Sequence, residues 1–97
     1  MYNNNRVNYT ELNFDHIVEF TQDSTVFAAG RENGSGHMRL FLINESTGHV
    51  YTRNGRADSW EQLNGSDRDT ILARLSVARH NHIPVYKING TNGTHTA

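Results

Sequence analysis

Aromatic, arginine and histidine side chains recur along three consecutive segments of the chain, and these residue types can bind a partner by stacking and by charge. If the segments pair as antiparallel strands, the period of two along a strand places these side chains on one face of a sheet. Such a face suits a protein interface, and it also suits a nucleotide or a single-stranded nucleic acid. The candidate binding residues are Phe27, Arg31, His37, Arg39, Phe41, His49, Tyr51 and Arg53.

The same alternation assigns an aliphatic face to the other side of the sheet, and we expect this face to pack against a helix and form the core. In an alternative interpretation, segment 9–20 covers the candidate binding face, which would then also belong to the core. The expected members of the aliphatic face are Val26, Ala28, Met38, Leu40, Leu42 and Val50.

The histidines do not predict a metal site. His80 and His82 could supply two of the three nitrogen ligands of a zinc site. The third ligand would come from His37 or His49. A His-x-His pair presents both rings on one side only in a strand, and this pair falls at the expected end of a helix. The chain also has no cysteine. We therefore expect neither a metal nor another cofactor.

No arrangement of residues indicates catalysis. Asp67 and Asp69 lie two residues apart in an expected helix, so their carboxylates point in different directions. The glycine-containing segment 34–36 is not followed by the lysine and helix of a phosphate-binding loop. No serine lies in the strand–turn–helix glycine pattern of a serine hydrolase. The sequence therefore predicts a protein that is not an enzyme and has no catalytic residues.

Five Asn-Gly dipeptides indicate where the chain turns, because both residue types tolerate the positive φ that tight turns require. Two of them, together with a glycine-containing turn at 44–48, bound expected strands at 24–31, 37–44 and 49–53, which would form an antiparallel meander. The dipeptides begin at Asn33, Asn54, Asn64, Asn89 and Asn92.

A C-terminal helix is expected after the meander. Ser66 can cap its start, and Ile71 and Leu75 belong to an apolar stripe with helical spacing. Pro84 ends the helix, and residues 85–88 have the composition of a short final strand.

Segment 9–22 fits two structures, because its apolar residues alternate as in a strand and also fall on one face of a helix. A short helix is favoured, because the polar residues 22–24 separate this segment from the clearer strand that follows. The predicted fold class is α+β: a three-stranded antiparallel meander packed on one C-terminal helix, with a short N-terminal helix, or fourth strand, and a short final strand.

The 97 residues suffice for one small domain, which we expect to span 9–88, with flexible ends at 1–8 and 89–97. The formal net charge is −1, so no general attraction to nucleic acid or to a membrane is expected. No apolar run resembles a signal peptide or is long enough to span a membrane, and cysteine is absent. These features predict a soluble cytoplasmic protein.

The favoured function is a small non-enzymatic binding protein that regulates or inhibits a protein partner through the aromatic and arginine face. Self-association through the same face, as a homo-oligomer, is compatible with this function, and so is an origin in a phage or another mobile element. The alternative is a nucleotide or nucleic-acid binding module that uses the same face for stacking and phosphate contacts.

Overall fold

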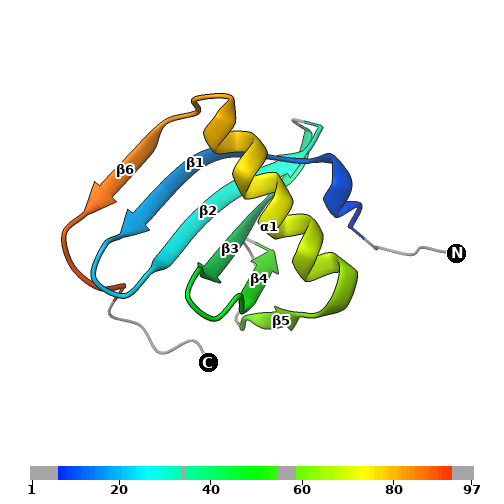
Figure 1. Cartoon of the computed structure of the whole chain (residues 1–97). Helices are drawn as coiled ribbons and strands as arrows, with labels where there is room; N and C mark the ends of the chain where they lie inside the picture. The colour runs from blue at the N-terminus through cyan, green and yellow to red at the C-terminus, as the bar shows by residue number, and fades with distance from the viewer. Residues whose placement is uncertain (1–6, 34, 55–58, 93–97) are drawn as a thin grey trace, which may run out of the picture.

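A computed structural model describes residues 7–33, 35–54 and 59–92, which fold into one sheet, one helix and a short 3-10 turn (Figure 1). The 3-10 turn is η1 (Tyr9–Glu11) and the helix is α1 (Gly65–His80). The strands are β1 (Leu12–Phe20), β2 (Thr25–Glu32), β3 (Ser35–Asn44), β4 (Val50–Asn54), β5 (Glu61–Leu63) and β6 (Val85–Ile88).

The six strands form one mixed sheet in the order β5-β4-β3-β2-β1-β6. Neighbours from β1 to β5 are antiparallel, and the strands β2, β3 and β4 are the predicted meander. The chain then crosses the sheet through α1, and β6 pairs parallel with β1 at the far edge. Figure 1 shows α1 across one face of the sheet. The predicted α+β class, the C-terminal helix and the short final strand are confirmed.

Segment 9–22 takes the strand alternative after a single 3-10 turn, so the favoured helix is wrong. Strand β1 pairs with β2 along one edge and with β6 along the other. As a strand the segment satisfies backbone groups on both of these neighbours, which a helix could not do. A β-bulge lies between Phe14 and His16, and it keeps both Phe14 and Ile17 on the buried side despite their spacing of three.

The faces of β3 are the reverse of those expected from the sequence. Glu32 pairs with Ser35, so only two residues separate these strand partners instead of the expected longer loop. Between this pair and the Gly30–Arg39 pair, β3 advances by four residues while β2 advances by two, and Ala28 then pairs with Phe41. A shift of one residue exchanges the two faces of a strand. Phe41 therefore points toward α1, and Leu40, on the next position of β3, points away from it.

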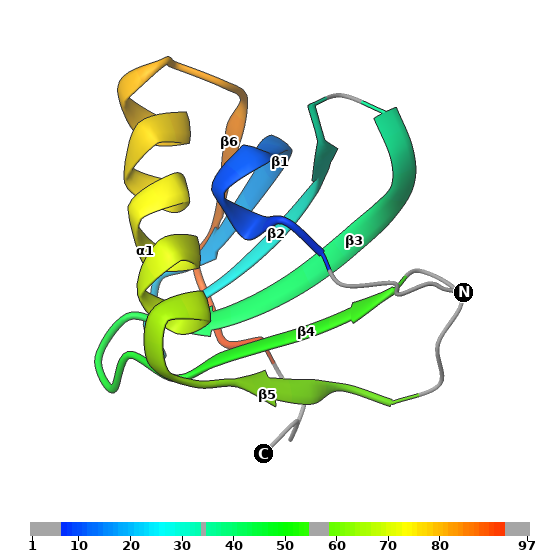
Figure 2. The same ribbon diagram turned by 90° about the vertical axis from the view of Figure 1, so that its right-hand side faces the viewer.

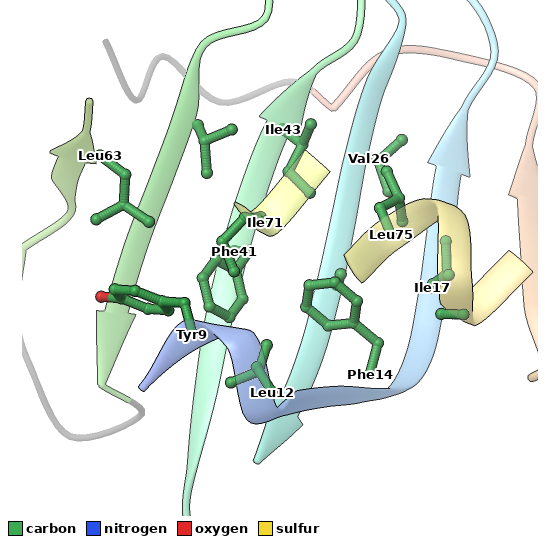
Figure 3. Close-up of a cluster of buried hydrophobic side chains, with 13 residues drawn as sticks. Tyr9, Leu12, Phe14, Ile17, Val26, Phe41, Ile43, Leu63, Ile71 and Leu75 are labelled. Atoms are coloured by element: carbon green, nitrogen blue, oxygen red, sulfur yellow. The ribbon is translucent and has the colours of Figure 1, made fainter. Parts of the chain in front are cut away.

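The core lies between the sheet and the layer formed by α1 and η1 (Figure 2). Figure 3 shows the rings of Tyr9, Phe14 and Phe41 close together in it. Phe41 has no exposed surface, and its ring meets the rings of Phe14 and Tyr9 edge to face at centroid distances of 5.3 and 6.2 Å. Each such pair adds about 0.5–1.5 kcal/mol beyond area burial. Ile71 and Leu75 of α1 are also buried here.

The flexible ends expected at 1–8 and 89–97 lie partly outside the described residues. Where the structure describes them, one end makes a hydrogen bond to β2 and the other to the turn between β1 and β2. The Asn8 amide donates to the Glu32 carboxylate at 3.0 Å, and the Asn92 amide donates to the Asp23 carboxylate at 3.0 Å.

Candidate functional site

The face of the sheet that points away from α1, here called the outer face, carries a row of residues that crosses all six strands. Registered partners in a sheet project on the same side, so consecutive pairings define the row. Figures 1 and 2 show α1 and η1 together on the opposite face. From β6 to β5 this central row consists of Tyr86, Val18, Phe27, Leu42, Tyr51 and Gln62.

Two shorter rows flank this one on the outer face. One begins at β6 and becomes polar toward β3, and its members are Ile88, Phe20, Thr25 and Asn44. The other becomes basic toward β4, and its members are His16, Ala29, Leu40 and Arg53.

The outer face is apolar and partly exposed. At its centre Leu42 is 5% exposed, although it does not belong to the core cluster beneath α1. Toward β6 the exposure rises to 58% for Tyr86 and 45% for Ile88. Phe27 and Tyr51 are half-buried. The face therefore offers side chains that can still lose apolar area to a partner.

Five of the eight predicted binding residues share the outer face. They come from β2, from β4 and from the residue just before β4, and they alternate with residues that point into the core. These five are Phe27, Arg31, His49, Tyr51 and Arg53.

The other three predicted residues lie elsewhere. Phe41 is in the core, where a partner cannot contact it. Arg39 pairs with Gly30 and therefore lies on the α1 side, where it lines a recess beside Tyr9 and Asp67. His37 is exposed in the irregular end of β3, between the partners of Gly30 and Glu32. The predicted grouping of three arginines on one face is therefore wrong.

Side-chain contacts restrain the side chains at the β4 end of the outer face. The rings of His49 and Tyr51 meet edge to face, with centroids 6.5 Å apart. The guanidinium carbon of Arg53 lies 5.3 Å from the centroid of the Trp60 ring, which is within the range of a cation–π interaction. Side chains that are already ordered lose less conformational entropy when a partner binds.

Sequence reasoning missed the part of the outer face that β1 and β6 supply. Val18 and Phe20 flank Glu19 in β1, and Tyr86 and Ile88 flank Lys87 in β6. The period of two was visible in segment 9–22, but the helix favoured there removed β1 from the expected sheet. Leu40 and Leu42 were missed because the expected register of β3 was displaced by one residue.

The histidines are not gathered into a ligand set in the described part of the chain. No three His, Cys, Asp or Glu side chains lie close enough there to hold a metal ion. His80 ends α1, while His82 follows it with a φ of 61°. None of the helical segments described by the structure has both the length and the apolar composition to cross a membrane.

Comparison with protein-family models, with curated proteins and with solved structures gives no match to this chain.

Proposed function

We propose that this chain is a small non-enzymatic binding protein that regulates or inhibits a protein partner by docking it on the outer face. The observation that carries the proposal is the row from Tyr86 to Gln62, in which five of six registered residues are aromatic or aliphatic. Contiguous apolar surface of this kind marks interaction sites in folded proteins. The cytoplasm is the proposed location, consistent with a chain that has no cysteine.

The dimensions of the outer face support a protein partner. The rows hold six, four and four residues, and positions about 4.8 Å apart across strands and about 7 Å apart along them span roughly 470 Å² of sheet. A standard protein interface buries about 800 Å² on each side, with an apolar centre and a polar rim. The outer face has the size of such a centre, and Arg31, Asn44 and Gln62 lie toward its rim.

The edges of the sheet support docking on the face instead of addition of a strand. Strand β5 has only three residues, Glu61–Leu63. Strand β6 has four residues, includes Lys87 and follows directly after Pro84. Short edge strands with charged residues and proline are the means by which proteins discourage edge-to-edge pairing.

The alternative function, binding of a nucleotide or nucleic acid, receives less support. Only Arg31 and Arg53 of the three expected arginines share the outer face, and Arg53 is engaged with Trp60. The central row has no cationic member, whereas phosphate contacts provide most of the affinity for nucleic acid.

The proposal is tested by comparing the partners retained by three forms of the tagged chain in extracts of its native cells. The test variant is Tyr51→Ala combined with Tyr86→Ala, which removes the two tyrosine rings of the central row. The matched control is Val77→Ala, because Val77 is a 39% exposed apolar residue on α1. We expect the wild type and the control to retain the same protein, and the double variant to lose it.

Identical retention by all three folded forms would contradict the proposed role of the outer face. Retention of nucleic acid by the wild type, lost in the double variant, would instead support the alternative function.

A further inference from the structure

Two of the five Asn-Gly dipeptides are described in full, and the structure holds them differently. Asn64–Gly65 lies at the junction of β5 and α1, and Asn89–Gly90 follows β6. Both pairs are followed by a hydroxyl residue, Ser66 or Thr91, so their local sequences are closely similar. A difference in their chemistry would therefore come from the fold.

We propose that Asn64 is a site of spontaneous deamidation, and that the fold protects Asn89 from the same reaction. The main-chain nitrogen of the following glycine attacks the side-chain amide carbon of asparagine and loses its proton to water. A carbon–nitrogen bond forms, and the side-chain nitrogen leaves as ammonia. Water then opens the resulting cyclic imide at either carbonyl, which yields aspartate or isoaspartate. Glycine permits the attack because it has no Cβ to obstruct the approach.

Both reacting groups of the first pair are accessible. Asn64 is exposed, and its side chain makes no capping hydrogen bond to α1. Gly65 is also exposed, and a Cβ built on it would have no atom within 4 Å. As the first residue of α1, Gly65 carries one of the amide groups for which a helix has no internal acceptor.

Hydrogen bonds restrain the corresponding groups of the second pair. The Gly90 amide, which would be the nucleophile, donates to the Ile88 carbonyl at 2.9 Å. The Asn89 side-chain oxygen accepts from the Thr21 hydroxyl at 3.4 Å. The Gly90 carbonyl also accepts from the Gln22 amide at 2.9 Å, which ties the backbone to the turn after β1. Attack at Asn89 requires some of these bonds to open first.

The two products at position 64 would act differently on α1. An aspartate would place a carboxylate at the helix N-cap, where it interacts favourably with the helix dipole. An isoaspartate would lengthen the backbone between Leu63, which is 8% exposed in the core, and the first turn of α1. The modification thus alters the connection between β5 and α1, which positions the helix.

The test is to incubate the folded full chain at mildly alkaline pH and to measure deamidation at both positions by peptide mass spectrometry. We expect Asn64 to react about tenfold faster than Asn89, the ratio that follows from opening one or two ordinary hydrogen bonds before reaction. Equal rates, or a faster reaction at Asn89, would overturn the proposal.

Two controls separate the fold from the sequence. In denaturant the two rates should converge, and a ratio that persists there would show that sequence alone sets it, which also contradicts the proposal. The Gly65→Ala variant should slow the reaction at position 64 and leave position 89 unchanged.

Discussion

Phe41 connects the two aromatic residues that come from the N-terminal part of the chain. Tyr9 and Phe14 both place their rings edge to face against it, and its own ring is fully buried. An aromatic side chain in β3 is equally suited to the core and to a partly exposed outer face. The register of the β2–β3 hairpin decides which of the two faces Phe41 occupies, and the residue type does not reveal this register.

Replacing Phe41 by alanine should therefore lower the free energy of unfolding by about 3–5 kcal/mol, through lost burial and the cavity that remains. Urea unfolding measures this loss. Phe27→Ala is the matched control, because Phe27 is only half-buried on the outer face, and its loss should be clearly smaller. Equal losses would indicate that both faces of β3 and β2 are covered to the same extent.

Asp23 should make the stability depend on pH. Its carboxylate accepts hydrogen bonds from the main-chain amides of Asn92 and Thr25, and the Asn92 bond contributes most to holding its pKa below the ordinary value of 3.8. A lowered folded-state pKa stabilises the fold above the unfolded-state value, and this contribution is lost as the pH falls through the folded-state value.

We expect the wild type to be more stable than Asp23→Asn at neutral pH, and the difference to shrink as the pH falls below about 4. Chemical unfolding of both proteins at several pH values measures it. A difference that stays constant over this range would exclude the Asp23 carboxylate as its source.

At the scale of secondary-structure elements, β1 and β2 approach closely at Gly30. A Cβ built on Gly30 would collide with the main-chain carbonyl of Asn13, and neither strand can yield without disturbing the ladder. The bulge at Phe14 and His16 lies beside this contact. Glycine is required here by the proximity of two strands and not by an unusual φ.

Gly30→Ala should consequently destabilise the protein by about 1–3 kcal/mol, the range for inserting an extra methyl group into a packed site. The matched control is Gly90→Ala, since a Cβ on Gly90 would make only an ordinary contact, 3.9 Å from Ile88. Thermal unfolding of both variants measures the difference, and equal midpoints would contradict the close packing of β1 on β2.

The elements were predictable from the sequence to different degrees, for physical reasons. The turns between β2, β3 and β4 were visible because Asn and Gly tolerate positive φ. The register was not visible, because it depends on loop length to within one residue. Strand β5 was missed because a segment of three residues is too short to show a period. The parallel pairing of β6 with β1 could not be predicted, because it joins two segments that are distant in the sequence.

At the scale of the whole molecule, α1 and η1 cover one face of the sheet, while the outer face carries the exposed side chains of Tyr86 and Ile88. The residues of the outer face were therefore predicted only in part: Phe27, Tyr51 and the basic residues near them were placed together, but the contribution of β1 and β6 required the complete strand order. Ion pairs from Arg79 to Glu19 and Glu45 hold α1 on its own side of the sheet.

Self-association of the purified chain gives a prediction at this scale. If two copies meet through their outer faces, the oligomer should depend weakly on salt, because the central row has no charged member. Native mass spectrometry and sedimentation at low and high salt measure this. The double variant Tyr51→Ala with Tyr86→Ala should be a monomer, and Val77→Ala should behave as the wild type. A steep decline with salt would indicate that charge, and not the central row, holds the copies together.

The parallel pairing of β6 with β1 has a consequence for synthesis on the ribosome. Residues 12–20 leave the ribosome early, whereas residues 85–88 leave it only after all other strands have been made. Until then one edge of β1 lacks the backbone hydrogen-bond partners that β6 later supplies. Nascent chains can pair incorrectly with one another at such an open strand edge. The outer face is incomplete for the same interval, since Tyr86 and Ile88 are its last members to arrive. Competence to bind a partner should therefore appear after the other five strands are already paired.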